Sequence, residues 1–279
     1  MKVAAECRDC LRRLVRQAAA LSTDDEQARG QAIAAGLRIV DEDFHDDVPS
    51  IAIATQIHQA IKTITGNPDP YRRMKDEEVT ISRELLQEIS PAYAPGLKGY
   101  LALSVCGNAI DFFRDMDTIK RDVKAEVMFA LDDSRRFEEK LKKATGLLFL
   151  ADNAGEVFFD LPLVRWLRQH TAVTYVVKEH PVQNDLTLDD LKRSGLLREF
   201  DPVITTGTAT PGVLFDMASS EFKTAFRSTE LILAKGMGYY EALTELPDDG
   251  RVLYLLKAKC APVADSLRVA LGSNVAMLR

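Results

Sequence analysis

Acidic, amide and lysine side chains follow short apolar segments in the second half of this 279-residue chain. Asp152 and Asn153 come directly after one such segment, and Asp185 follows the next. Lysines follow three of the segments, and Lys235 and Lys257 are among them. Carboxylate and amide oxygens suit Mg²⁺ or Mn²⁺, whereas lysine suits a phosphate. Together they predict a site with the fixed positive charge that phosphoryl transfer requires.

The apolar segments are the elements that must position these side chains. Each is short and is followed by a polar or glycine-containing turn and then a helical pattern, which is typical of parallel strands buried on both faces. Open parallel sheets bind ligands at the carboxyl ends of their strands, so the polar turns should meet at one edge. We predict a Rossmann-like α/β domain over 146–279, with a parallel-type sheet layered between helices. Its strands are expected at 147–151, 173–177, 203–206, 231–234 and 252–256.

Residues 1–145 have a different pattern, with apolar residues three and four positions apart. This spacing predicts an all-helical N-terminal domain, and the two prolines in Asn67-Pro68-Asp69-Pro70 mark a break within it. The charged segment Asp122–Ala144 is expected to be a long helix.

Simpler interpretations exist for the individual residues. Asp152 with Asn153, or Asp185 alone, could cap a helix N-terminus. The joint occurrence of polar residues after five consecutive strands favours a binding site instead. The glycines at 207 and 212 have the spacing of a nucleotide-binding loop, but Val213 and Leu214 occupy the Lys and Ser/Thr positions.

Composition limits the partners. The net charge is -6 and the isoelectric point about 5.4, which argues against nucleic acid because phosphate backbones bind basic surfaces. No charge-free stretch reaches the roughly 20 apolar residues of a membrane-spanning helix. The N-terminal residues lack the apolar core of a signal peptide, so we expect a cytoplasmic protein. The oligomeric state stays open.

The chain has four cysteines, too few for a disulfide scaffold. Cys7 and Cys10 lie on one face of a predicted helix, and Cys260 follows the fifth predicted strand. These three could form a second site with a structural, metal-binding or redox role. Cys106 is expected to be a small core residue.

Several motifs resemble those of the damage-control phosphatases, a family long catalogued as domain of unknown function eighty-nine. The CxxC motif with a late KC is similar to the prokaryotic-type branch, and the resemblance covers nearly the whole chain. The motifs are Cys7-x-x-Cys10, Asn67–Tyr71, Gly107–Asp111, DNAGE at 152–156, NDLTLDD at 184–190, KGMGYYE at 235–241 and KAKC at 257–260.

The resemblance implies a divalent-metal phosphatase that hydrolyses small phosphorylated metabolites, such as sugar phosphates or damaged cofactor derivatives, with Mg, Mn, Co or Ni. Asp152, Asn153 and Asp185 match the metal ligands. Tyr239 departs from the family pattern, because relatives usually carry Asn there. The positions that match the pocket lining are Glu156, Asn108, Asp111, Lys235 and Lys257, and Glu241 is a further candidate for substrate binding.

Two mechanisms are open. Asp152 could attack phosphorus directly and form an aspartyl-phosphate. Alternatively, a metal-bound water could attack, positioned by Glu156 or Asp185. Two other functions compete. An S-adenosylmethionine-dependent carboxyl methyltransferase would share the α/β layering, but the first turn has a single glycine. A non-catalytic metal- or redox-binding protein would rest on the CxxC motif.

Overall fold

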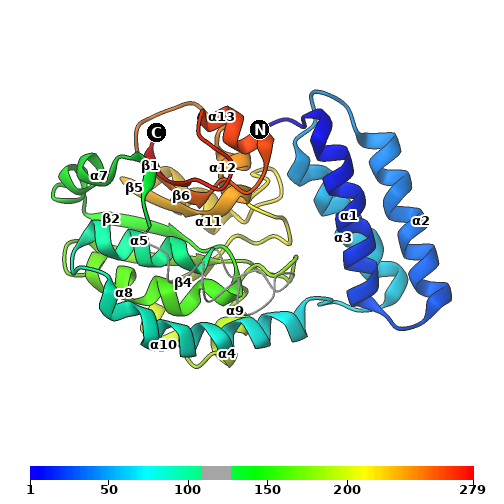
Figure 1. Cartoon of the computed structure of the whole chain (residues 1–279), viewed down its shortest axis with the longest axis horizontal. Helices are drawn as coiled ribbons and strands as arrows, with labels where there is room; N and C mark the ends of the chain where they lie inside the picture. The colour runs from blue at the N-terminus through cyan, green and yellow to red at the C-terminus, as the bar shows by residue number, and fades with distance from the viewer. Residues whose placement is uncertain (109–126) are drawn as a thin grey trace.

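The computed structural model describes residues 1–108 and 127–279 (Figure 1). In this part of the chain seven strands form one sheet, in the order β1-β7-β6-β5-β2-β3-β4. The central strands are parallel, while β7 runs antiparallel to β6 and parallel to β1. The bounds are β1 Phe129–Asp132, β2 Gly146–Leu150, β3 Ala172–Val177, β4 Val203–Thr205, β5 Leu231–Lys235, β6 Val252–Lys257 and β7 Asn274–Leu278.

Helices flank this sheet, which confirms the predicted fold class. The first three helices form a layer of their own to one side in Figure 1. The helices are α1 Ala5–Ser22, α2 Glu26–Asp43, α3 Ser50–Thr65, α4 Arg72–Ile89, α5 Leu97–Gly107, α7 Ser134–Leu141, α8 Val157–Leu167, α9 Leu188–Arg193, α10 Leu197–Phe200, α11 Ser220–Ser228, α12 Gly236–Leu243 and α13 Ala261–Leu267. Short 3-10 turns lie at Ser90–Ala92 and Ala154–Glu156.

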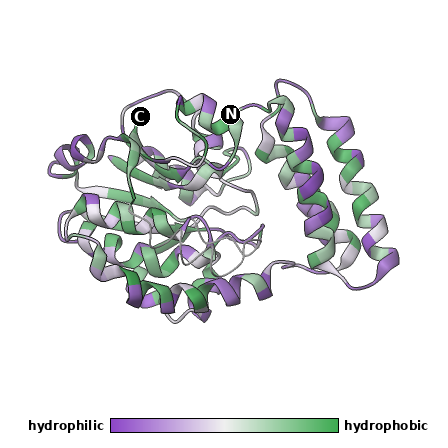
Figure 2. Cartoon of the chain, viewed as in Figure 1, coloured by the Kyte–Doolittle hydropathy of each residue, from purple (hydrophilic) through white to green (hydrophobic). Residues whose placement is uncertain are grey.

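The sheet is buried on both faces because its strands are apolar at consecutive positions. In β2, Leu147 and Phe149 pack into one core, whereas Leu148 and Leu150 pack into the core on the opposite face. Alternate side chains of a strand point to opposite faces, so a strand covered on both sides needs an unbroken apolar run. Figure 2 shows the hydrophobic colour concentrated in the strands and in the helices packed on them.

Helices α1, α2 and α3 share a separate small core that includes Leu11, Val15, Ile53 and Ile57. Helix α5 belongs to the sheet's core instead, because Leu101 and Val105 pack with residues of β2 and α8. The division into domains at 145 and 146 stays a prediction, but α5 and β1 show that residues before 146 also build the sheet layer.

The expectation of one long helix over Asp122–Ala144 is wrong in its described part. Phe129–Asp132 forms β1, and only Ser134–Leu141 is helical. The four residues of β1 alternate between half-buried and exposed, as expected for a strand at the sheet edge. No helix in residues 1–108 or 127–279 is long and apolar enough to cross a membrane.

Candidate active site

The turns after β2 and β3 are joined through their backbones. Asn153 and Asp185 form an antiparallel bridge outside the named strands. The N–H of Leu186 donates to the carbonyl oxygen of Asp152 at 2.8 Å, and the N–H of Ala154 donates to that of Asn184 at the same distance. The three predicted metal ligands, Asp152, Asn153 and Asp185, therefore lie side by side at the carboxyl edge of the sheet.

Two amide side chains connect Asp152 to Glu156. The NH₂ group of Asn108 donates to Asp152 Oδ2 at 3.2 Å and to Glu156 Oε1 at 2.5 Å. The NH₂ group of Asn153 donates to the same two atoms at 3.1 and 2.6 Å. Asn108 ends α5, so it brings the preceding helical segment into contact with the turn after β2. Asp152 and Asn153 keep partial exposure, which makes them the accessible part of this group.

Lys235 lies beneath this group and is completely buried. Its ammonium contacts Glu156 Oε2 at 2.7 Å and Asp160 Oδ1 at 2.6 Å, and it donates to Ser104 Oγ at 2.8 Å. Asp160 also accepts the hydroxyl of Tyr175 at 3.1 Å. Since an ammonium has three donors, the protein occupies those of Lys235. Lys235 therefore holds Glu156 in place, and it has no donor left for a phosphate.

Lys178 is a second fully buried cation, and it lies beside Asp185. Its ammonium donates to the carbonyl oxygen of Gly212 and lies 3.4 Å from Asp185 Oδ2. It also lies 4.2 Å from the centre of the Tyr239 ring, within the range of a cation–π contact. Lys178 thus connects the turns after β3, β4 and β5.

The carboxylates at this edge repel one another. Burial, together with the charges of Glu156 and Asp185, raises the pKa of Asp152 well above its usual value. Burial also raises the pKa of Asp185 to about 6, although Lys178 opposes the rise. Glu156 is 1% exposed and Asp185 is 3% exposed, so water screens little of this charge. A cation at this position would relieve the repulsion.

These residues fit a hard divalent cation by their chemistry. Asp185 Oδ2 is buried without a hydrogen-bond partner, and Asp152 is accessible beside it. Within the described residues, no three His, Cys, Asp or Glu side chains are grouped so as to hold a metal on their own. A cation here would therefore also need an amide oxygen such as that of Asn153, together with substrate or water oxygens, as is usual for Mg²⁺.

Gly236 follows Lys235 and shapes the floor of the site. Its φ is +78°, in the region that favours glycine. A Cβ built on Gly236 would come within 1.9 Å of Asp152 Oδ2. The turn after β5 therefore touches the Asp152 carboxylate through bare backbone.

Other predicted site residues lie elsewhere. Asp111 is outside the described residues. Lys257 is half-buried at the end of β6, where its charge acts on Cys106 of α5. Glu241 accepts the hydroxyl of Ser50 and is not part of the Asp152 group. Cys106 is buried, as expected, with its sulfur 2.7 Å from the hydroxyl of Tyr93.

Asp160, Ser104 and Tyr175 were not predicted from the sequence, although Asp160 and Ser104 contact Lys235 and Tyr175 donates to Asp160. One signal was available. Asp160 lies four residues after Glu156 in a helical pattern, so both carboxylates face the same side. Lysine after an apolar strand was interpreted as accessible, yet all five residues of β5 are buried.

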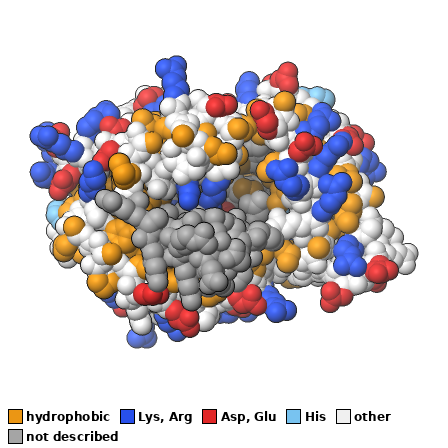
Figure 3. Space-filling model, viewed as in Figure 1, with side chains coloured by type: hydrophobic (Ala, Val, Ile, Leu, Met, Phe, Trp, Pro, Cys, Tyr) orange, Lys and Arg blue, Asp and Glu red, His pale blue; other side chains and the backbone are white. Residues whose placement is uncertain are grey.

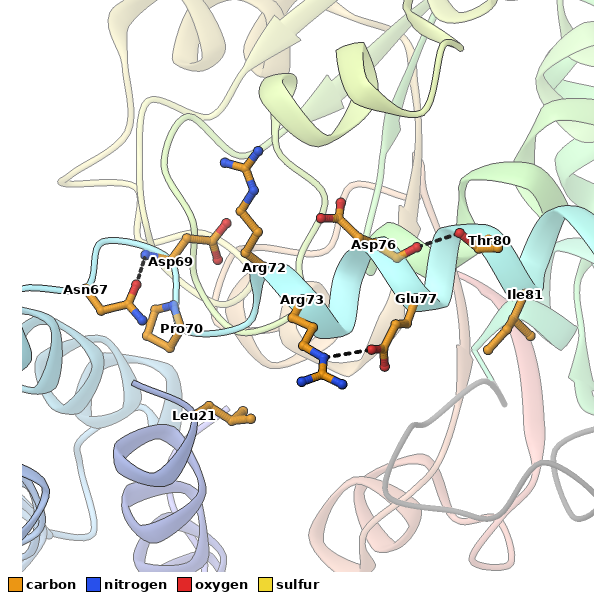
Figure 4. A pocket seen from close by; sticks show the side chains of 10 residues that line it. All are labelled: Leu21, Asn67, Asp69, Pro70, Arg72, Arg73, Asp76, Glu77, Thr80 and Ile81. Carbon is orange, nitrogen blue, oxygen red and sulfur yellow. Dashed lines mark hydrogen bonds and ion pairs between the residues drawn. The ribbon is translucent and has the colours of Figure 1, made fainter. Parts of the chain in front are cut away.

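A separate hollow of about 780 Å³ opens between the end of α1 and the outer face of α4 (Figure 4). Its charged side chains are paired, as in the contact of Arg73 with Glu77 at 2.9 Å and that of Asp69 with the buried Lys75 at 2.8 Å. The backbone N–H of Asp69 likewise donates to Asn67 Oδ1 at 3.0 Å. None of the predicted metal ligands lines it, so the candidate site stays at the strand ends.

Comparison with known proteins extends over nearly the full chain. Residues 3–275 match the model of the damage-control phosphatase ARMT1-like domain. A damage-control phosphatase of Pyrococcus horikoshii is 33% identical, over 99% of this chain and 98% of its own length. A damage-control phosphatase of Archaeoglobus fulgidus is 31% identical, over 99% of both chains. The crystal structure of a DUF89 family protein from Pyrococcus horikoshii superposes with a TM-score of 0.90 at 31% identity, covering 100% of this chain and 99% of that one.

Proposed function

This chain belongs to the damage-control phosphatase ARMT1-like family, and from that premise we propose a divalent-metal-dependent phosphatase that acts on small phosphorylated metabolites. Its relatives' names support a phosphatase role in general. The observation that carries the metal dependence is the bridge between Asn153 and Asp185, which gathers Asp152, Asn153 and Asp185 around buried, mutually repelling charge.

In this proposal Asp152, Asn153 and Asp185 hold a cation of the Mg, Mn, Co or Ni class. When bound, such a cation would withdraw negative charge from a phosphate oxygen. Glu156 has both oxygens engaged, by Asn108 and Asn153 on one side and by Lys235 on the other. Its role is therefore to orient the two amides.

Charge on the remaining phosphate oxygens needs accessible lysines. Lys235 and Lys178 are fully buried and already bonded within the protein. Lys259 is exposed, and its charge lowers the pKa of Asp152, which places it near the site. We assign phosphate neutralisation to Lys259. This changes the role that the resemblance suggested for Lys235.

Both routes expected from the sequence stay open. Either Asp152 attacks phosphorus, or a water molecule attacks and gives its proton to a carboxylate. Trapping of a phosphoryl group on Asp152 during turnover would support the first route. No observation favours the methyltransferase alternative, since the turn after β2 holds buried acids and amides in place of a glycine-rich bend.

The proposal is tested on chelator-treated protein with p-nitrophenyl phosphate and a panel of sugar phosphates. Phosphate release is measured without metal and with Mg²⁺, Mn²⁺, Co²⁺ or Ni²⁺. We expect one or more ions to restore release in the wild type and not in Asp152→Ala. Asp189→Asn is the matched control, because Asp189 is an exposed acid on α9. Release that needs no metal would refute metal dependence, and no release from any substrate by folded, metal-loaded protein would refute the phosphatase.

A further inference from the structure

A second cavity, of about 490 Å³, lies between α1 and the α/β layer, and three of the four cysteines line it. Cys7 and Cys10 come from the first turns of α1, and Cys260 directly precedes α13. We call this space the cysteine cavity. It borders the turn after β4 through Pro211 and helix α12 through Gly238. Helices α1 and α13 are packing neighbours, so thiols from distant parts of the sequence face one space.

The three thiols differ in their access to solvent. Cys10 is exposed, whereas Cys7 and Cys260 are half-buried. The sulfur of Cys7 accepts the backbone N–H of Ala4 at 3.4 Å. Burial raises the pKa of the Cys7 and Cys260 thiols, with a further rise from Glu241. Cys10 is therefore the thiol that a dissolved reagent meets first.

We propose that the cysteine cavity is a thiol-oxidation site, in which Cys10 exchanges with a low-molecular-weight disulfide and Cys260 resolves the product. In the first step the Cys10 sulfur attacks the reagent, and one reagent thiol leaves with the proton of Cys10. In the second step the Cys260 sulfur attacks Cys10, and the other reagent thiol leaves with the proton of Cys260. One pair of protein thiols is oxidised and one reagent disulfide is reduced.

Helix spacing disfavours Cys7 as the partner of Cys10, which leaves Cys260 as the other cysteine that lines the cavity. Cys7 and Cys10 lie three apart on α1, where β-carbons are about 5–6 Å apart, and a disulfide requires about 3.5–4.5 Å. Cys260 has extended backbone just before α13, so helix spacing does not restrict it. A metal ion is the weaker alternative, because no cluster of metal-ligating side chains forms in the described residues, and all three cysteines are among them. The cross-link would tie α1 to the α/β layer.

The test uses reduced full-length protein and oxidised glutathione, with alkylation and peptide mass mapping as the readout. We expect the wild type to lose one pair of thiols and to yield a peptide that links Cys10 to Cys260. In Cys260→Ser the reaction should stop at the mixed disulfide, with one glutathione retained on Cys10. Cys10→Ser should stay reduced. Cys106→Ser is the control that should behave as wild type, since Cys106 is buried away from this cavity.

A second readout is the thermal midpoint of the cross-linked protein, expected to rise by roughly 5–10 °C over the reduced form because the link closes a long loop. A disulfide found only between Cys7 and Cys10 would overturn the proposal. So would glutathione retained by the wild type without a cross-link, or a metal ion that copurifies with the thiols. None of these readouts depends on phosphatase activity, so failure of the proposed function leaves the test intact.

Discussion

Lys235 and Lys75 have the same surroundings in two regions of the molecule. Each is completely buried between two carboxylates, Lys235 at 2.7 and 2.6 Å from Glu156 and Asp160, and Lys75 at 2.8 Å from both Asp69 and Asp190. Burial and pairing alone cannot tell which of the two serves chemistry.

The difference lies in what the carboxylates contact next. Glu156 accepts hydrogen bonds from the amides of Asn108 and Asn153, and the Asn153 amide also donates to the partly exposed Asp152. Asp190 instead contacts residues at the two ends of its own helix, α9. It accepts the hydroxyl of Thr187 at 2.6 Å and forms an ion pair with Arg193 at 2.7 Å. The two lysines thus differ in what their carboxylates contact, because Glu156 reaches the Asp152 group, whereas Asp190 is held by residues of α9 and its N-cap.

The largest expected effect is the loss of phosphatase activity when Asp152, which belongs to the Lys235 region, is replaced. Asp152→Asn should lower kcat/KM by about 10³-fold, because a proposed metal ligand or nucleophile is lost, while the thermal midpoint stays close to wild type. The measurement is steady-state phosphate release beside a thermal melt, with Asp189→Asn as the control. Activity within tenfold of wild type would remove Asp152 from the site.

Replacing the lysines tests the comparison itself. Lys75→Met and Lys235→Met should each lower the free energy of unfolding by about 3–5 kcal/mol, because both leave buried carboxylates without a cation. Lys235→Met should lower activity per folded molecule more than Lys75→Met does, because Lys235 contacts Glu156 directly, whereas Lys75 acts on Asp185 through its charge alone. Urea unfolding and assays corrected for the folded fraction give both numbers, with the exposed Lys192→Met as control. Equal loss of activity in both variants would contradict the different roles that we assign to Lys75 and Lys235.

Two tyrosines sharpen the comparison near Lys235. The hydroxyl of Tyr175 donates to Asp160, whereas that of Tyr239 is buried without a hydrogen-bond partner. Tyr175→Phe should therefore cost about 1–3 kcal/mol of unfolding free energy, and Tyr239→Phe less than about 1 kcal/mol. Denaturant titration of the two variants measures this difference. A larger cost for Tyr239→Phe would mean that its hydroxyl has a partner in solution.

The smallest expected effect is in the pH dependence of stability. Burial raises the pKa of Asp190, but Lys75 and Thr187 outweigh it and hold that pKa below its usual value. The stability from Asp190 is therefore present above the ordinary carboxyl pKa of about 3.9 and is lost as the pH falls. Burial raises the pKa of Asp160 instead, so its contribution has the opposite sign.

Asp190→Asn should accordingly flatten the acid loss of stability, by at most about 1.4 kcal/mol per pH unit, and Asp160→Asn should steepen it. Urea unfolding at several pH values between about 6 and 3 measures both slopes. Parallel slopes in the two variants would show that the two carboxylates titrate alike.

The sequence indicated the central sheet because β2 to β6 are unbroken apolar runs, a pattern with few alternatives in a chain of this size. β1 and β7 were missed. β1 is a short, half-exposed edge strand, and β7 runs antiparallel to β6, outside the repeated parallel strand–helix pattern. Its place inside the sheet depends on pairing with both β6 and β1, which local pattern does not encode.

The candidate site could be predicted in part for a similar reason. Asp152 and Asn153 follow β2 closely, and Asp185 lies in the turn after the neighbouring strand β3, so the order of the strands brings the two turns together. The role of Lys235 could not be derived, because it depends on Asp160 and Ser104, which come from helices on the face of the sheet. Their packing angle and depth are set by the core and not by spacing along the chain.

The pairing of β1 with β7 also matters for how the protein is made. About 140 residues separate the two strands, and β7 is the described strand that β1 pairs with. At the usual pace of synthesis, β1 leaves the ribosome roughly ten seconds before that partner. During this interval its backbone N–H and C=O groups are open to pairing with other chains. The half-exposed, Asp-terminated sequence of β1 therefore suits a segment that stays unpaired in water until β7 is made. Rapid overexpression should favour aggregation through this edge of the sheet.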